Sequence, residues 1–555
     1  MENAQLAEHL DLLSKLLDIH GADSFKSKSY AAAAFTIEKL PYSLATTPPE
    51  KWKSIRGIGS SVAGAITQLL ETGHLVQLNE LLNSTPTGVV EMLQIKGVGP
   101  KKIHTIWKEM GIESMGELLY ACQENRLLHF KGFGEKTQVS IENSIRFLLQ
   151  HKGHFLYAEI EVLLPTIESF LHQQFGKEKV AVTGNFRRQL PTLEELAFVV
   201  VASKESIKEK FLTAQPPELV EETDQSLCYK LKNGLAIRLF ASENLSWDLF
   251  KTSSSTEFYQ AVLAVPEYAD IIPTPTEAPD DSFFIRRKLP VISPARRESK
   301  KHLEKAYFTT PIQEDSIKGL IHCHSNWSDG ANSIEEMALA CIEKQWEYMV
   351  LSDHSASAFY ANGLKADRVA AQHQQIDDLN KKLAPFRIFK SIESDILNDG
   401  SLDYEPTILS SFDLIIASIH SNLRMNIDTA TNRLLKAIEN PFTSILGHPT
   451  GRLLLSRAGY PINHKKIIDA CAAHKVAIEI NAHPRRLDLD WEWVDYAIDN
   501  GVLISINPDA HTLSGLTDVR YGVRVAQKSR LTPDMNLSSF SKIQFEQWLA
   551  DRKRS

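Results

Sequence analysis

The stretch Ile321-His322-Cys323-His324-Ser325-Asn326-Trp327-Ser328-Asp329-Gly330 decides the fold of the C-terminal part of this chain. It begins at the end of a short apolar run, 319–321, so two imidazoles and a carboxylate follow directly on a predicted strand. The next segment opens with Ser333 and Glu336 at capping-box spacing and continues with apolar residues at helical spacing. A strand, a polar loop and a helix in this order form the repeating unit of a parallel sheet or barrel.

The same arrangement recurs along the rest of the chain. In sequence order the later groups are Asp353-His354, Glu393, Ser418-Ile419-His420, Gly447-His448 and Asp509-Ala510-His511. Nearly all of them lie just beyond short apolar runs, where a β/α barrel builds its active site. A single histidine could instead cap a strand or complete a core, but so many groups in register favour a shared site. Imidazole and carboxylate without cysteine indicate a catalytic zinc, manganese or iron centre.

Composition limits the classes of protein to be considered. A chain of 555 residues predicts three or four domains, and 43% hydrophobic with 23% charged residues is typical of soluble globular proteins. The longest apolar run, 196–202, is the length of a strand, and the N-terminus lacks the pattern of a signal peptide. Five cysteines without a CxxC pair favour a reducing compartment. We therefore expect a cytoplasmic protein without membrane association.

Near the N-terminus, one short design occurs three times, at 55–60, 95–100 and 130–135. Each copy has an apolar residue, a base, two glycines around an apolar residue, and then a predicted helix. The residues in question are Gly57, Gly59, Gly97, Gly99, Lys101, Gly132 and Gly134. Glycine permits a tight turn whose bare amide groups can face a phosphate, and the positive end of the next helix adds to this attraction. One copy would be weak evidence, whereas three predict a domain that binds the DNA backbone.

With these motifs the chain resembles the bacterial X-family DNA polymerases that carry a C-terminal PHP (polymerase and histidinol phosphatase) domain. The resemblance rests on the hairpins and on the sequences GNFRR at 184–188, IHCHSNWSDG at 321–330, LSDHS at 351–355, GHPTGR at 447–452, EINAHPRRL at 479–487 and NPDAH at 507–511. It implies a multidomain α/β protein. A helical DNA-binding domain would span 1–150, a nucleotidyltransferase palm and thumb 155–315, and a PHP β/α barrel 318–545.

The resemblance also implies three divalent metal ions, Mn²⁺, Zn²⁺ or Fe²⁺, in the barrel. His322 and His324 would hold one ion together with Glu393 and Asp509. His420 and His448 would hold a second with Glu393, and Asp329, His354 and His511 would hold the third. The implied catalytic residues are Asp329, His354, Glu393 and Asp509, and the implied chemistry is phosphodiester hydrolysis at DNA 3′ ends. Arg452 and Arg485 resemble phosphate-contacting positions, although arginines at such a place often form surface salt bridges.

The palm segment departs from the family pattern. Alignment on Gly184, Arg187 and Arg188 puts Glu195 and Ala197 at the paired aspartate positions and Ala236 at the third. Two methyl groups cannot ligate the Mg²⁺ ions that nucleotide transfer requires. We therefore expect an inactive or much weakened polymerase site, with Mg²⁺ as a cofactor only if that site works.

These observations lead to one hypothesis and three alternatives. The hypothesis is a DNA-repair protein that acts mainly as a metal-dependent 3′–5′ exonuclease or 3′-end phosphodiesterase on gapped, nicked or 3′-ended DNA. It is expected to be a monomer with weak dNTP binding. The alternatives are a functional gap-filling polymerase, which dNTP incorporation would reveal, a PHP phosphatase of small molecules, which the hairpins disfavour, and a DNA scaffold without catalysis.

Overall fold

The computed structural model describes residues 1–22, 24–52, 54–123, 126–150, 153–211, 217–265, 284, 290–358, 361–455 and 458–554. The chain divides into two compact units, Met1–Lys152 and Gly153–Ser555. The boundaries predicted for the second and third domains stay a prediction, because both lie within the second unit. In the described part of the chain, no helix has the combination of length and hydropathy needed to cross a membrane.

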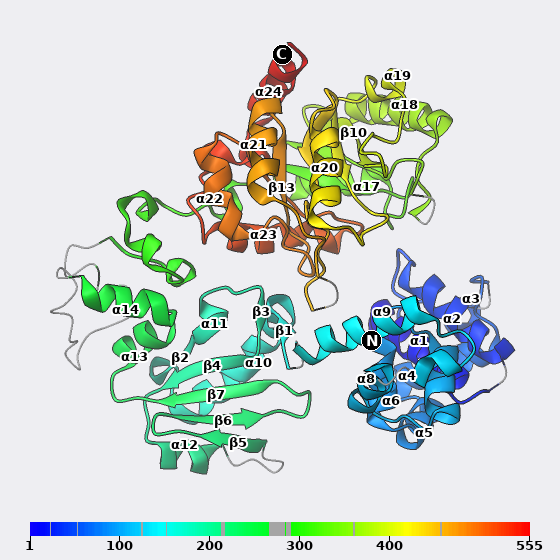
Figure 1. Cartoon of the computed structure of the whole chain (residues 1–555), viewed down its shortest axis with the longest axis vertical. Coiled ribbons are helices and arrows are strands. Elements are labelled where there is room, and N and C mark those ends of the chain that lie inside the picture. Colours follow the sequence, from blue (N-terminus) through cyan, green and yellow to red (C-terminus); the bar gives the residue numbers. More distant parts are fainter. Residues whose placement is uncertain are drawn as a thin grey trace. The chain divides into compact units, whose positions relative to one another are not determined.

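The first unit is built from helices (Figure 1). They are α1 (Asn3–Ile19), α2 (Ser24–Glu38), α3 (Pro49–Trp52), α4 (Ser60–Thr72), α5 (Val76–Ser84), α6 (Thr87–Glu91), α7 (Pro100–His104), α8 (Met115–Gln123) and α9 (Glu135–Gln150). Helix α1 forms the centre, because Leu6, Leu10 and Leu13 recur at helical spacing and are fully buried. The three glycine turns predicted from the sequence lie directly before α4, α7 and α9.

A five-stranded sheet begins the second unit. Its order is β2-β4-β7-β6-β5, with β2 (Val180–Thr183), β4 (Glu195–Val200), β5 (Glu218–Glu222), β6 (Ser226–Lys230) and β7 (Ala236–Ala241). Only the central pair β4–β7 is parallel among these pairings. The helices around this sheet are α10 (Tyr157–Phe175), α11 (Gly184–Arg187), α12 (Lys204–Lys210), α13 (Leu245–Thr252) and α14 (Thr256–Ala264). Strand β4 covers most of the strand-length apolar run 196–202 noted in the sequence, and its residues 196–200 are buried.

A parallel sheet of seven strands forms the C-terminal part of the second unit. The strands are β8 (Gly319–Cys323), β9 (Tyr348–Leu351), β10 (Arg387–Asp395), β11 (Leu414–Ser418), β12 (Thr443–Leu446), β13 (Ala477–Asn481) and β14 (Ile504–Asn507). They lie in sequence order across the sheet. A parallel bridge between Cys323 and Ala510 brings the two edges together, so the sheet is a nearly closed barrel.

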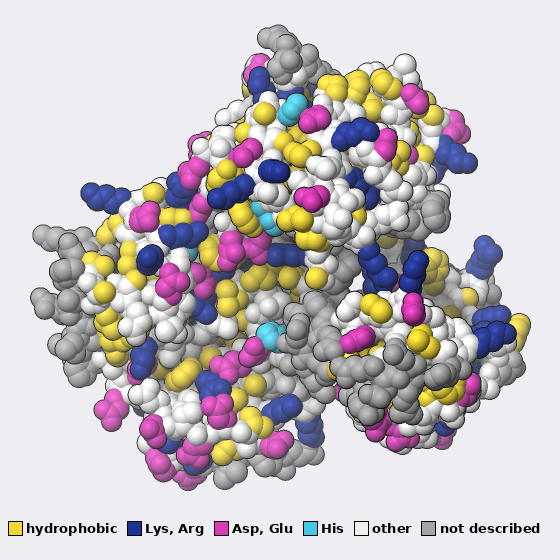
Figure 2. Space-filling view, in the orientation of Figure 1, with side chains coloured by type: hydrophobic (Ala, Val, Ile, Leu, Met, Phe, Trp, Pro, Cys, Tyr) yellow, Lys and Arg dark blue, Asp and Glu magenta, His cyan; other side chains and the backbone are white. Residues whose placement is uncertain are grey.

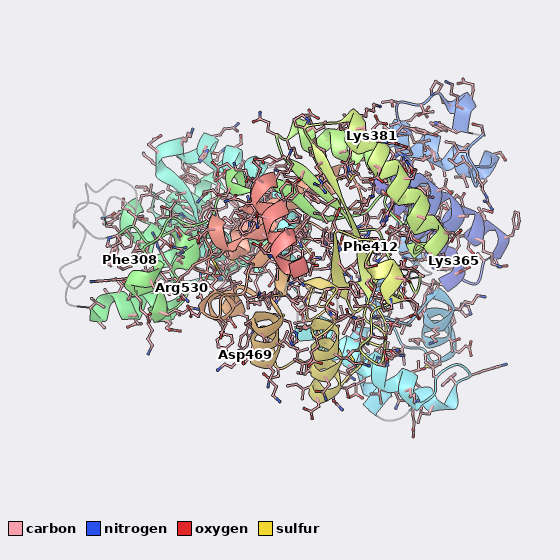
Figure 3. The ribbon with its side chains drawn as sticks, turned by 90° about the horizontal axis from the view of Figure 1, so that it is seen from above. Phe308, Lys365, Lys381, Phe412, Asp469 and Arg530 are labelled. Atoms are coloured by element: carbon pink, nitrogen blue, oxygen red, sulfur yellow. The ribbon has the colours of Figure 1, made fainter. Side chains whose placement is uncertain are left out.

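Helices alternate with these strands, as the capping and periodic patterns predict. They are α17 (Ile334–Glu343), α18 (Ala366–Lys382), α19 (Pro406–Leu409), α20 (Ile427–Ile438), α21 (His464–His474), α22 (Trp491–Asp499), α23 (Val519–Ala526) and α24 (Lys542–Arg554). Figure 3 shows α18 running between Lys365 and Lys381 beside the strands. The helical first unit, the mixed sheet and the parallel barrel thus confirm the predicted fold class.

Buried charged side chains join the segment after the palm to the barrel. Lys528, which is fully buried, donates to the carbonyl of Arg188 at 2.5 Å and pairs with Glu298 at 2.7 Å. Arg296 donates to the carbonyls of Gln527 and Ser529 at 3.0 and 2.7 Å. Each buried cation therefore has oxygen partners, which is the condition for burying charge without a large penalty.

Candidate metal centre

The strand ends of the barrel bring the predicted ligands together. His322 and Glu393 lie within β8 and β10, and His354, His420 and His448 follow β9, β11 and β12 by two or three residues. The carboxyl ends of parallel strands meet at one end of a barrel, so these side chains converge. His322 and Asp509 adopt the left-handed backbone conformation, with φ of 65° and 53°. Non-glycine residues in this conformation are strained and cluster at functional sites.

Glu393 is the centre of the cluster. Its Oε1 atom lies 3.1 Å from Nε2 of both His420 and His448, and 3.4 Å from Nε2 of His322. Its Oε2 atom lies 3.0 Å from Nδ1 of His354. The carboxylate is 1% exposed, so it contacts imidazoles from four different strand ends away from water. This is the geometry of a carboxylate that could bridge two metal ions.

A second carboxylate, Asp509, extends the cluster toward the surface. Its Oδ1 atom lies 3.0 Å from Nε2 of His324 and 3.5 Å from Nε2 of His322. Further out, Asp329 approaches Nε2 of His511 at 3.4 Å and Nε2 of His354 at 3.7 Å. Asp329 and His511 are 25% and 37% exposed, so this outer part of the cluster is open to solvent.

Three groups of residues place ligand atoms close enough to hold an ion. They are His322, His324, Glu393 and Asp509; His354, Glu393 and His420; and His324, Asp329, His354 and His511. Atoms of each group lie within 4.8 Å of one another. His324 and His354 occur in two groups each, but a neutral imidazole has one free lone pair and can ligate one ion. Buried Nε2 of His322 has no hydrogen-bond partner among the described residues, which fits a ligand atom.

The grouping resembles the predicted assignment with two differences, one of which is that His324 joins the predicted third set of Asp329, His354 and His511. The first group is the set predicted for one ion. The second contains His354 in place of His448, although His448 contacts the same oxygen of Glu393 as His420. The assignment of each ligand to an ion therefore stays a prediction, as do the catalytic roles.

Electrostatics favours the charged form of the central carboxylate. Burial alone would raise the pKa of Glu393, but the imidazoles of His420 and His322 outweigh it and hold the pKa well below its usual value. For His420, burial lowers the pKa, and the carboxylates of Glu393 and Asp395 overcome this and raise it to about 10. The same carboxylates that attract protons to these imidazoles would also attract metal cations.

Sequence reasoning missed a layer of buried carboxylates behind the candidate ligands. Glu479 accepts from Nδ1 of His322 at 2.6 Å, and Asp395 accepts from Nδ1 of His420 at 2.5 Å. Asp353 accepts from the hydroxyls of Ser325 and Ser328, and so fixes the loop that carries Asp329. A carboxylate inside a fully buried strand, as at Glu479, is a signal that could have been noticed, because acidic residues are rarely buried without a partner.

The arginines near the site differ in how far their guanidinium groups are engaged by other residues of the protein. Arg452 donates to Asp490 at 2.7 Å and to the carbonyls of Arg486 and Leu487, so it ties the loop after β12 to the segment after β13. Arg485 is 52% exposed and lies 3.8 Å from Glu159. Arg486, which the sequence analysis did not single out, places Nε 3.8 Å from Asp509. It is thus an arginine adjacent to the ligand cluster, and the roles predicted for the other two stay predictions.

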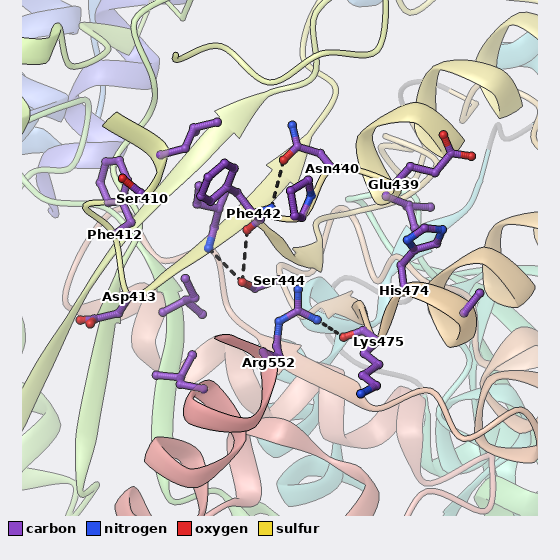
Figure 4. Close-up of a pocket in the computed structure, with 17 residues that line it drawn as sticks. Ser410, Phe412, Asp413, Glu439, Asn440, Phe442, Ser444, His474, Lys475 and Arg552 are labelled. Carbon is purple, nitrogen blue, oxygen red and sulfur yellow. Dashed lines mark hydrogen bonds between the residues drawn. The ribbon is translucent and has the colours of Figure 1, made fainter. Parts of the chain in front are cut away.

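A cavity of about 600 Å³ lies at the opposite end of the barrel. It is lined at the starts of β11 and β12 by Asp413 and Ser444, and by Arg552 of α24 (Figure 4). Arg552 donates to the carbonyls of Lys475 and Thr443. Because active sites of such barrels form at the carboxyl ends of the strands, the cavity is separate from the ligand cluster.

The palm positions have a different chemistry. Glu195 and Ala197 on β4 pair with Ala236 and Arg238 on β7, so all four side chains share one face of the sheet. Arg238 donates to Glu195 at 2.8 Å, and also to Glu221 at 2.9 Å. A guanidinium thus neutralises the carboxylate retained among the three aligned positions.

Other palm residues are engaged with their neighbours. Gly184 has a φ of 67°, and a Cβ at this position would lie 3.1 Å from that of Ala197. Arg187 donates to Ser253 at 3.1 Å, and Arg188 pairs with Glu298 at 3.1 Å. The two arginines of the palm signature therefore support local structure.

The hairpin turns of the first unit are open. Gly57, Gly97 and Gly132 have φ values of 91°, 81° and 94°, which explains why glycine is needed there. Gly59 and Gly99 precede α4 and α7, neither helix has a side-chain cap, and a Cβ at either glycine would meet no atom within 4 Å. The turns before both helices therefore leave space for an anion, which the first amides of α4 and the amide of Lys101 in α7 could contact. Acidic and basic side chains are interspersed over the face of the second unit in Figure 2.

Comparison with known proteins agrees with this geometry. Residues 1–75 match a helix-hairpin-helix domain, and residues 89–141 match a SAM-like helix-hairpin-helix tandem. A probable phosphatase of Thermoanaerobacter sp. (strain X514) is 26% identical over 42% of this chain and 94% of its own length. The probable phosphatase YcdX of Escherichia coli O81 (strain ED1a) is 30% identical over 30% of this chain and 73% of its length.

A further relative covers nearly the whole chain. The DNA polymerase/3′-5′ exonuclease PolX of Bacillus subtilis (strain 168) is 32% identical over 95% of this chain and 96% of its own length. Hairpins, palm sheet and barrel therefore match in one continuous alignment. The chain belongs to the bacterial X-family DNA polymerases with a C-terminal PHP domain, a family of phosphoesterase enzymes.

Proposed function

We propose that this protein repairs DNA mainly by hydrolysing phosphodiester bonds at 3′ ends, as a metal-dependent 3′–5′ exonuclease or 3′-end phosphodiesterase. One contrast carries the proposal. Glu393 in the barrel is buried among imidazoles whose nitrogens lie 3.0 to 3.1 Å from its oxygens, whereas Glu195 in the palm is paired with Arg238. Glu393 is therefore arranged to bind metal ions. Glu195 is already paired with a cation of the protein itself, the guanidinium of Arg238.

In the barrel, bound divalent ions would polarise a phosphodiester and supply an activated water. Glu393 and Asp509 would provide the negative charge that holds them, with His322 and His324 as neutral donors. Asp329 and His511 are the exposed members of the cluster, so they would lie on the side from which DNA enters. Arg486, beside Asp509, would offset charge on the phosphate being cleaved.

The helical unit would hold the DNA. Its three hairpins present accessible amides and exposed bases, and such elements bind phosphates without reading sequence. Helix-hairpin-helix matches cover all three copies, and the B. subtilis relative is named for two activities on DNA. We therefore propose gapped, nicked or 3′-ended DNA as the substrate. A cytoplasmic location, a monomeric state and weak dNTP binding complete the proposal.

The palm would contribute little synthesis. Nucleotide transfer requires carboxylates that hold two ions, one on the attacking 3′ oxygen and one on the triphosphate. Ala197 and Ala236 offer no ligand atoms, and Arg238 occupies the same face with a positive charge that opposes cation binding. Loss of such positioning and charge neutralisation typically lowers rates by orders of magnitude.

Matched substitutions in the two sites test the proposal. A 5′-labelled gapped duplex is incubated with Mn²⁺, and shortening of the 3′ end is followed with wild type, Glu393→Gln and Glu195→Gln. We expect Glu393→Gln to abolish shortening and Glu195→Gln to leave it unchanged. Addition of dNTPs with Mg²⁺ should give little extension. The proposal would be contradicted if the wild type extended the primer at the rate of an ordinary repair polymerase and Glu195→Gln abolished this extension.

The barrel alone also matches relatives named probable phosphatases, which favours hydrolysis of small phosphate esters as a second candidate. Release of inorganic phosphate from phosphorylated metabolites, compared with cleavage of DNA by the same preparation, separates the two. Faster turnover of the metabolites would make the small-molecule activity the principal one.

A further inference from the structure

We infer that Glu479 and Asp395 are positioning residues which make the metal positions unequal, with two tightly held ions and one exchangeable ion. The inference rests on the proposed metal-dependent function, because it assigns an order of affinity within that centre. It concerns residues outside the nine predicted ligands.

Glu479 has no free lone pair with which to ligate an ion. Its Oε1 atom accepts from the backbone N–H of His448 at 3.0 Å and from the amide of Asn481 at 3.0 Å. Its Oε2 atom accepts from Nδ1 of His322 at 2.6 Å and from the amide of Asn507 at 2.7 Å. Four donors satisfy a carboxylate, so Glu479 acts through its neighbours rather than on an ion directly.

Two candidate ligands are fixed by this one side chain. The hydrogen bond to Nδ1 of His322 keeps the proton on that nitrogen, so the lone pair of Nε2 points to Glu393 and Asp509. The hydrogen bond to the backbone of His448 fixes the strand end from which its imidazole reaches Glu393. A carboxylate behind a metal-bound histidine orients the ring and strengthens it as a donor.

Asp395 does the same for a second imidazole. It accepts from Nδ1 of His420 at 2.5 Å and from the hydroxyl of Ser357 at 2.8 Å. Nε2 of His420 is therefore directed at Glu393, 3.1 Å away. Both positions around Glu393 thus have an imidazole backed by a buried carboxylate.

The outer group differs in its support and its exposure. Nδ1 of His511 donates to a backbone carbonyl, that of Asp509, at 2.9 Å, and lies 3.8 Å from the Oδ1 atom of the same residue. His354 lies between two candidate ligands, with Nδ1 3.0 Å from Glu393 and Nε2 3.7 Å from Asp329. With Asp329 and His511 also partly exposed, water competes for an ion here. This position should hold its ion most weakly.

The order of affinity can be measured on the whole wild-type protein without any assay of activity. Protein stripped of metal is reloaded with excess Mn²⁺ and passed through a desalting column, and the ions retained per chain are counted by elemental analysis. Free Mn²⁺ is then titrated by electron paramagnetic resonance. We expect two ions to be retained and a third to bind in a separate, weaker phase. Three ions that bind and leave in one phase would overturn the inference.

Two isosteric substitutions test whether Glu479 and Asp395 support the two tightly held ions. Glu479→Gln and Asp395→Asn should each weaken one tightly held ion roughly 10- to 100-fold and leave the weak phase in place. Asp329→Asn should remove only the weak phase. Asp495→Asn serves as the control, because this buried carboxylate pairs with Lys301 and Tyr307 and contacts none of the candidate ligands. Unchanged tight binding in Glu479→Gln and Asp395→Asn would refute the positioning role.

Further measurements distinguish a variant that fails to fold from a failure of the inference, and that failure from a failure of the proposed function. Thermal unfolding identifies a variant that fails to fold, and the wild-type titration then still decides the order of affinity. If two classes of ion are found but DNA is not hydrolysed, the proposed function fails and the inference stands. If DNA is hydrolysed while all ions bind equally, only the inference fails.

Discussion

Neutralising the bases of the hairpins should change how DNA binding depends on salt. Arg56, Lys96 and Lys131 stand beside the three glycine turns and all are exposed. Each phosphate contact contributes about 0.9 to the slope of log K against log salt on duplex DNA. Changing all three to Gln should therefore make the slope shallower by about 2.7. Between 50 and 200 mM salt, wild type should lose roughly 40-fold more affinity than the variant.

Fluorescence anisotropy on a labelled gapped duplex measures these slopes. The control changes Lys305, Lys365 and Lys466, which are exposed on the second unit, to Gln and alters the net charge equally. It should leave the slope close to that of wild type. Equal slopes for wild type and the hairpin variant, or equal losses in variant and control, would show that the hairpins do not provide the phosphate contacts.

The remaining predictions concern the second unit. Lys528→Met should lower the free energy of unfolding by about 3 kcal/mol, because Glu298 loses a buried partner. Lys436→Met breaks an exposed pair and should lower it by less than about 1 kcal/mol. Equal shifts in the thermal unfolding of the two variants would contradict this prediction. Arg486→Ala should slow DNA hydrolysis at saturating Mn²⁺ more than Arg485→Ala, and the reverse order in a rate assay would favour the sequence-based assignment. Replacing Glu195, Ala197 and Ala236 by Asp should restore measurable Mg²⁺-dependent synthesis only when Arg238→Ala is added. Primer extension by the variant that retains Arg238 would show that this guanidinium does not oppose metal binding.

Much of the barrel could be predicted because its pattern is local. Each apolar run ends in a polar pair such as Asp353-His354, and strand ends in a parallel barrel meet regardless of the distance along the chain. The resemblance to a family supplied the ligand set, which periodicity alone could not. The hairpin glycines could be predicted equally well, because the positive φ at Gly57 or Gly97 is a requirement of the local backbone.

What could not be predicted depends on contacts between distant residues. Glu479 is identified as a positioning residue only when donors from three other places in the chain are seen around it. The sequence shows that aspartates are missing from the palm, but only strand register places Arg238 opposite Ala197. The partners of Arg452 were likewise beyond the sequence, because Asp490 lies in a different loop, and its predicted phosphate contact stays a prediction.

Arg238 also limits how a metal site could be introduced into the palm. An aspartate placed at Ala197 or Ala236 would add a carboxylate to the face that already holds a guanidinium. The product would be an additional internal ion pair rather than a free metal ligand. Removing Arg238 alone would leave Glu195 and Glu221 without their shared partner. A metal site on this face therefore requires several substitutions together.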